Sequence, residues 1–148
     1  MRPALLPLLA AIATPAIAGP ADLHSIAGMQ SYYRVLIAFA PRLSDPRLRA
    51  QAAEMARFGA GAAERDLLFV QVGDGKVIGA SDTPARLAAR YRVPANAFRS
   101  LLIGKDGTVA LTQASPIAAA TLRARIDAMP MRREEARRMR PGLGKPKP

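Results

Sequence analysis

The sequence predicts a single α/β domain with a central mixed sheet, flanking helices, and a C-terminal hairpin and helix. Short apolar runs rich in branched residues alternate with amphipathic stretches that begin at cap-proline pairs. An Asp-Gly pair separates the last two apolar runs, which is the strongest short-range signal for a β-hairpin. The chain has 148 residues, half of them hydrophobic, so its size fits one domain rather than two.

Two apolar runs have the profile of central strands. Residues 34–39 are rich in branched side chains and are bounded by Pro41, and residues 66–72 form a second run of the same kind. Continuous apolar runs of this length are typical of strands that are buried on both faces. Residues 76–78, which follow a Gly-Asp-Gly turn, are expected to form a minor strand or part of a loop.

Each of these strands is followed by a predicted helix. Asp45 is placed to cap a helix whose first position is Pro46 and which ends at the glycines after residue 58. Asp82 or Thr83 would cap a second helix, which stops before Pro94. The order up to this point is strand, helix, strand, helix.

A hairpin and a final helix complete the predicted domain. Residues 100–104 and 108–111 flank Lys105-Asp106-Gly107, where a type I′ turn is expected because Asp and Gly tolerate positive φ. The pair Ser115-Pro116 is expected to open the final helix, which Pro130 interrupts.

This order of elements resembles the thioredoxin fold. Phe39-Ala40-Pro41 stands where the first central strand of that fold ends, and 101–107 matches its hairpin. On this register Ser44 and Arg47 occupy the positions of the two redox cysteines, and Arg99 falls at the position of the cis-proline. The degenerate active-site positions are therefore Ser44, Asp45, Pro46, Arg47 and Arg99.

The chain also resembles a family of exported bacterial proteins known as domain of unknown function 4174. The resemblance covers about residues 30–140 and implies a thioredoxin-like fold and a periplasmic or secreted setting, with no established activity. It is carried by Tyr33-Arg34-Val35-Leu36, Asp45-Pro46-Arg47-Leu48, Glu64-Arg65-Asp66-Leu67, Leu102-Ile103-Gly104-Lys105-Asp106-Gly107 and, most specifically, Ile126-Asp127-Ala128-Met129-Pro130-Met131-Arg132-Arg133.

The N-terminus has the order of a secretory signal peptide. Arg2 precedes an apolar stretch over residues 4–13, Pro15 breaks it, and Ala16-Ile17-Ala18 supplies small residues for cleavage after Ala18. The apolar stretch is shorter than the about 20 residues that span a bilayer, and no later segment could anchor the chain. We therefore expect a periplasmic or secreted protein with a signal peptide over residues 1–18 and a flexible lead over 19–31, ahead of a domain over 32–131.

Composition excludes several kinds of chemistry. The chain has no cysteine, so thiol redox catalysis is excluded, and His24 is its only histidine. One histidine cannot complete a zinc or redox-metal site, and a nucleophilic Ser44 would lack a base. No glycine-rich motif of the phosphate-binding kind is present. We expect no catalytic, cofactor or metal site; the stretch 44–47 is either a capping turn or an anion site at a helix N-terminus.

The densest charge lies at the C-terminus. The net charge is +11, and five arginines lie between residues 132 and 140. The stretch 132–148 is expected to be a basic tail that either docks on an anionic envelope surface or acidic protein, or is a solvated end. Export argues against nucleic acid as the partner. The residues that would contact an anionic partner are Arg132, Arg133, Arg137, Arg138 and Arg140.

These observations favour a periplasmic thioredoxin-like binding or accessory module without thiol chemistry. The rival class is an oxidoreductase or peroxiredoxin-like enzyme with non-cysteine chemistry. A third alternative is a protein that associates with the cell envelope through its arginine-rich tail alone.

Overall fold

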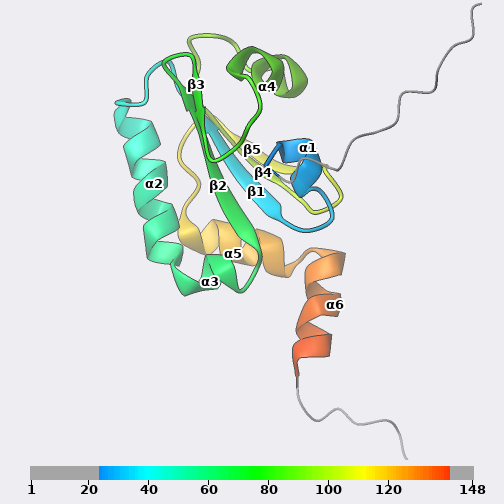
Figure 1. Ribbon diagram of the computed structural model, residues 1–148. Helices are drawn as coiled ribbons and strands as arrows, with labels where there is room; N and C mark the ends of the chain where they lie inside the picture. Colours follow the sequence, from blue (N-terminus) through cyan, green and yellow to red (C-terminus); the bar gives the residue numbers. More distant parts are fainter. Residues whose placement is uncertain (1–23, 141–148) are drawn as a thin grey trace, which may run out of the picture.

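The fold is built on a five-stranded mixed sheet with helices on both faces (Figure 1). The computed structural model describes residues 24–140. The predicted signal peptide and the segment beyond Arg140 lie outside these residues. Strand order is β3-β2-β1-β4-β5, so the first strand in sequence lies at the centre of the sheet.

The strands agree with the predicted ones. The central strand β1 (Arg34–Phe39) is buried along its whole length. It pairs in parallel with β2 (Leu67–Gly73) and antiparallel with β4 (Arg99–Ile103). The edges are β3 (Lys76–Ile78) and β5 (Val109–Gln113), each antiparallel to its neighbour. This arrangement confirms the predicted α/β class with a thioredoxin-like order of elements.

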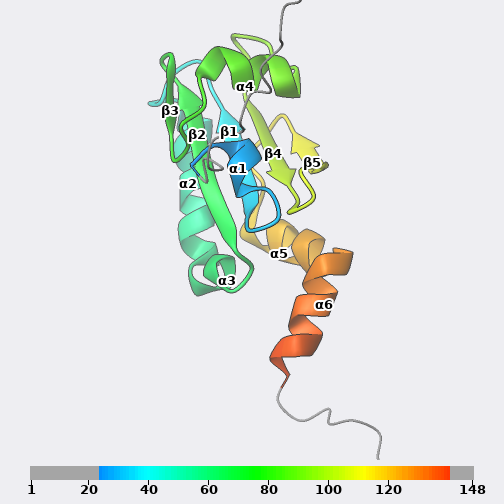
Figure 2. The same cartoon turned by 45° about the vertical axis from the view of Figure 1, so that its right-hand side comes forward.

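Helices cover the sheet in two layers, which Figure 2 shows from a second angle. One layer holds α2 (Pro46–Phe58), α3 (Ala60–Ala63) and α5 (Ala119–Asp127). The other layer holds α1 (Ile26–Met29) and α4 (Pro84–Tyr91). The last helix, α6 (Pro130–Met139), follows α5 and extends away from the sheet in both views.

Successive side chains of β1 point to opposite faces of the sheet, so the strand contributes to both layers of the core. Val35 and Ile37 pack with Leu87 of α4, whereas Leu36 packs with Phe58 of α2 and other side chains of the opposite layer. All of these side chains are less than 5% exposed. Burial of each contributes roughly 1.5–3 kcal/mol, so the fold needs no disulfide.

Two of the predicted caps are confirmed. The Asp45 side chain accepts a hydrogen bond from the backbone N–H of Arg47, and the Thr83 hydroxyl accepts one from that of Arg86. Asp82, the other candidate for the second cap, instead accepts a hydrogen bond of 2.7 Å from the backbone N–H of Ile26. Asp82 thereby ties α1 to the start of α4.

The structure differs from the flexible lead expected over residues 19–31. In the described part of that stretch, Ile26 and Met29 of α1 are each 4% exposed and belong to the core. The backbone N–H of Ser81 also donates to the His24 carbonyl. The four-residue helix is too short to show a period in the sequence, and tertiary packing explains its order.

The hairpin turn also differs from the expected type I′. The loop is longer, because the backbone N–H of Gly104 donates to the carbonyl of Thr108. Only Gly107 in this loop has positive φ, and the Asp106 carboxylate accepts from both the N–H and the hydroxyl of Thr108. The side-chain bonds of Asp106 favour this wider turn, and Ala110 is the extra residue of a bulge in β5.

The final helix begins later than expected at Ser115-Pro116. Ile117 is buried before the helix starts, where its N–H donates to Gln51 Oε1 and its carbonyl accepts from Gln51 Nε2. The first turn of α5 is capped from α2, because the backbone N–H of Ala119 donates to Glu54 Oε2 at 2.9 Å. Gln51 and Glu54 of α2 therefore determine the residue at which α5 begins.

Replacing Gln51 with leucine should lower the free energy of unfolding by about 2–4 kcal/mol, because the buried N–H and carbonyl of Ile117 would both lose their partner. Ser100→Ala removes one hydroxyl that donates to the same side chain and should cost about 1 kcal/mol. Urea unfolding measures both. Equal stability of Gln51→Leu and the unchanged protein would contradict this role.

Candidate functional site

The stretch 44–47, at the end of β1, holds an ion pair between Asp45 and Arg47. Arg47 Nε and Nη2 donate to the two oxygens of Asp45 at 3.0 and 2.8 Å. The Arg47 guanidinium also lies 5.1 Å from the centre of the Phe98 ring. Hydrogen bonds from Arg47 lower the pKa of Asp45 to about 2, so this carboxylate is ionised at neutral pH.

Ser44 and Arg99 are also predicted positions of this site, but they are separate from the ion pair in the described part of the chain. Ser44 is exposed, and no base pairs with its hydroxyl among residues 24–140. Arg99 begins β4, where its Nη1 donates to the Phe98 carbonyl at 3.0 Å. Because Arg47 is already paired with Asp45, the geometry favours a capping turn over an anion site here.

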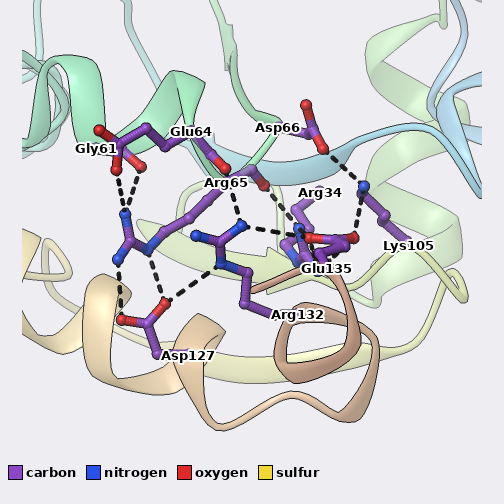
Figure 3. A network of polar contacts seen from close by, with 9 residues as sticks. All are labelled: Arg34, Gly61, Glu64, Arg65, Asp66, Lys105, Asp127, Arg132 and Glu135. Carbon is purple, nitrogen blue, oxygen red and sulfur yellow. Dashed lines mark hydrogen bonds and ion pairs between the residues drawn. The ribbon is translucent and has the colours of Figure 1, made fainter. Parts of the chain in front are cut away.

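The most elaborate polar structure lies at the opposite end of β1 (Figure 3). It joins the starts of β1 and β2, the hairpin loop, the end of α5, and α6. Sequence reasoning missed it. Its members are Arg34, Gly61, Glu64, Arg65, Asp66, Lys105, Asp127, Arg132 and Glu135.

Arg34 is the innermost member of this network. Its side chain is 0% exposed, and its Nη1 donates to the Arg65 carbonyl at 2.7 Å. Both terminal nitrogens also donate to the Glu135 carboxylate at 3.2 Å. The sequence contained one signal of this network, a single cation at the start of an apolar strand. A buried charge requires a partner, so such a residue indicates that an acidic side chain lies nearby.

Lys105 shares the same carboxylate. Its Nζ donates to Glu135 Oε1 at 2.8 Å and to Asp66 Oδ2 at 2.7 Å. Asp66 has positive φ just before β2, a conformation that Asp tolerates better than most residues. Glu135 therefore bridges two buried cations that belong to the central strand and the hairpin loop.

A second pair of cations continues the network. Arg65 Nε and Nη2 donate to the two oxygens of Asp127 at 2.8 and 2.9 Å. Arg132 Nη1 donates to the Glu64 carbonyl at 3.0 Å and lies 3.6 Å from Glu135. The arginine at position 132 is thus buried against the domain and is not available to an external partner.

The cations of this network are more deeply buried than its carboxylates. The four cationic side chains are at most 10% exposed, whereas Glu135 is 19% exposed and the other three carboxylates are 42–65% exposed. Burial by itself raises the pKa of Glu135, but hydrogen bonds from Lys105 and Arg34 outweigh it and the pKa is lowered. The hydrogen bonds from Arg65 lower the pKa of Asp127. Both carboxylates are charged at neutral pH.

The other arginines of α6 point away from the network. Arg133, Arg137 and Arg140 border a shallow hollow of about 240 Å³, and their side chains have no partner among the described residues. Arg138 lies 3.9 Å from Glu134, an exposed pair worth little to stability. The predicted basic cluster therefore divides into one buried arginine and four exposed ones.

This division moves the expected boundary of the domain. The sequence analysis placed residues 132–148 outside a domain that ends at residue 131. Arg132 and Glu135 instead make the contacts that hold α6 to the starts of β1 and β2. The Glu135 carboxylate turns inward to Arg34 and Lys105, whose charges are desolvated and require a partner.

No group of three or more His, Cys, Asp or Glu side chains that could hold a metal ion is present within 24–140. In the same range, no helix is long and apolar enough to cross a membrane. The network consists of ion pairs and hydrogen bonds that hold α6 to the starts of β1 and β2.

Comparison with known proteins identifies a family and distantly similar solved structures. The profile of a family described as "Domain of unknown function (DUF4174)" matches residues 25–135. A search of curated proteins finds no match. The crystal structure of StoA from Bacillus subtilis is similar with a TM-score of 0.45 and 15% identity, over 63% of this chain and 81% of that one. A likeness this distant transfers no activity or site.

The bridging role of Glu135 can be tested by charge removal. Glu135→Gln should lower the free energy of unfolding at neutral pH by about 2–3 kcal/mol, because two buried cations lose their shared carboxylate. The matched control is Glu134→Gln on the exposed side of the same helix, which should change stability by less than about 0.5 kcal/mol.

The same pair of variants has an expected pH dependence. Since the pKa of Glu135 is lowered from 4.5 in the fold, its contribution is complete above that value and is lost as the pH falls through the lowered pKa. The stability difference between Glu135→Gln and the unchanged protein should therefore shrink in acid. A difference that is constant from pH 7 into acid would show that Glu135 does not act as a carboxylate.

Proposed function

The chain belongs to the DUF4174 family, and we propose that it is a binding module that docks on an anionic membrane surface through the exposed arginines of α6. One observation carries this proposal. Within residues 24–140, the side chains of Arg133, Arg137 and Arg140 have no partner, and they share a hollow on one side of a helix whose other side is held to the domain. A fixed helix presents these charges without the entropic cost of ordering a free tail.

Electrostatics supports a weak, salt-dependent association. A basic residue near an anionic membrane contributes about 1 kcal/mol, so three or four arginines would contribute about 3–4 kcal/mol. Met139, which is 65% exposed beside these arginines, would add apolar contact with the lipid interface. The net charge of +11 favours the same kind of partner.

A periplasmic or secreted location forms part of the proposal. It rests on the order of Arg2, the apolar stretch over residues 4–13, and Ala16-Ile17-Ala18. In this setting the anionic surface would be that of envelope lipids. Thiol chemistry plays no role, because the chain has no cysteine.

Docking can be tested by substitution rather than truncation, because truncation would also remove Glu135. The triple variant Arg133→Ala, Arg137→Ala and Arg140→Ala should lose most binding to vesicles that contain phosphatidylglycerol. The control variant Arg42→Ala, Arg49→Ala and Arg86→Ala removes three exposed arginines elsewhere, so its net charge is the same. Vesicle sedimentation should show near-normal binding for the control, and weaker binding of the unchanged protein as salt rises.

Equal loss of binding in both triple variants would reduce the effect to net charge and contradict a site on α6. Absence of binding at low salt would contradict the membrane as the partner and favour an acidic protein instead.

Export predicts a defined mature protein. Cleavage after Ala18 should leave a chain that begins at Gly19, which intact-mass measurement of the exported protein detects. A protein that still begins at Met1, or one retained in the cytoplasm, would contradict the proposed location.

The enzyme alternative predicts turnover that the binding module should lack. Because Ser44 and Arg47 stand where sulfur would be needed, the purified protein should neither reduce insulin disulfides nor consume hydrogen peroxide above the rate of buffer. Activity that scales with protein and persists after metal removal would revive an oxidoreductase with non-cysteine chemistry.

A further inference from the structure

The last helix is attached to the domain in a different way from the other helices. Among residues 24–140, the hydrophobic clusters of the core include side chains from each of the helices α1 to α5 and none from α6. The buried residue of α6 is an arginine, Arg132. Its two large apolar side chains, Met131 and Met139, are 46% and 65% exposed. Polar contacts therefore hold α6 in place.

These polar contacts centre on two side chains of α6. The Glu135 carboxylate accepts hydrogen bonds from Arg34 at 3.2 Å and from Lys105 at 2.8 Å. Arg132 donates to the carbonyl of Glu64 at 3.0 Å. Charges buried in this way lose their hydration, and they recover it when the helix leaves. An attachment of this kind is therefore weaker than its short distances suggest.

The joint between α5 and α6 allows the helix to leave as one piece. Pro130 begins α6 and has no N–H, so the hydrogen bonds of α5 cannot continue through it. Met129, just before it, is extended with φ −68° and ψ 137°, as is typical of a residue that precedes proline. The side chain of Met129 packs against the core. The core thus anchors the joint, while α6 itself lies outside the core.

A detached α6 would not keep its helical form. The helix has ten residues, fewer than the about 12–15 that make an isolated helix even marginally stable in water. Detachment would therefore also dissolve the arrangement in which Arg133, Arg137 and Arg140 border one hollow. A surface that binds these three arginines together favours the docked helix, because a detached segment would first have to be ordered.

We propose that Glu135 is a latch that holds α6 in a docked, helical form, that α6 also detaches and unfolds as a unit, and that the docked form is the one that binds an anionic membrane. The last part rests on the docking proposed for α6 above and names how that docking is controlled. Glu135 acts as a positioning residue, because its partners are Arg34, Lys105 and Arg132 and not the three arginines of the hollow. The detached form is a minor state of the unchanged protein, on the order of 0.1–10%.

Hydrogen exchange tests for the two forms without any membrane. The amides of residues 134–138 should share one protection factor, at least about tenfold below that of the amides of β1, because detachment exposes them together. Glu135→Gln should leave these amides nearly unprotected, whereas those of β1 should stay protected. Glu134→Gln on the exposed side of the same helix is the matched control and should leave the protection of α6 unchanged.

Vesicle binding tests which form docks. Glu135→Gln and Glu134→Gln each remove one negative charge from α6, so net charge alone predicts the same small gain in binding to phosphatidylglycerol vesicles for both. The latch predicts different results for the two variants. Glu135→Gln should bind at least about threefold more weakly than the unchanged protein, because the apparent affinity falls with the fraction of docked helix. Glu134→Gln should bind at least as tightly as the unchanged protein.

The two measurements separate failure of the latch from failure of membrane docking. Amides of α6 that are as protected as those of β1, or whose protection falls gradually toward Met139, would overturn detachment of α6 as a unit. Equal vesicle binding by the two glutamine variants would overturn control of docking by Glu135. Absence of vesicle binding by the unchanged protein would overturn membrane docking and its control, and the exchange data would then decide the detachment of α6 by themselves.

Discussion

The contact of the Glu135 carboxylate with Arg34 and Lys105 holds together the end of the sheet where β1 begins. Arg34 is fully buried at the start of the central strand, and such a cation costs several kcal/mol of desolvation unless a carboxylate offsets it. The partner comes from a helix 101 residues further along the chain. Through this one side chain, the last helix becomes part of the domain rather than an appendage of it.

Local patterns predicted most of the fold. The apolar runs of β1 and β2 and the cap Asp45 are signals that residues a few positions apart create, and each was predicted correctly. For α4 the sequence offered Asp82 or Thr83 as the cap, and the structure selects Thr83. The start of α5 was placed too early because its true determinants, Gln51 and Glu54, lie on another helix. No local pattern contains that information.

The candidate sites were harder to predict from the sequence for the same reason. Arg132 and Arg133 are adjacent arginines that the sequence does not distinguish. The direction in which α6 leaves Pro130 buries the first and exposes the second. Charge density in the sequence therefore indicated the right helix but not its two sides. The stretch 44–47 at the other end of β1 was easier to interpret, because the absence of cysteine in the sequence alone excludes thiol chemistry. The structure adds that Asp45 and Arg47 form an ion pair there.

The most direct test of this account compares two shortened chains by urea unfolding. A chain that ends after Met139 retains Glu135, whereas one that ends after Met131 lacks it and leaves Arg34 and Lys105 without their shared carboxylate. The first should be as stable as the full chain, and the second should lose at least about 2 kcal/mol of its free energy of unfolding. Equal stability of the two shortened chains would contradict the role of α6 as a structural part of the domain.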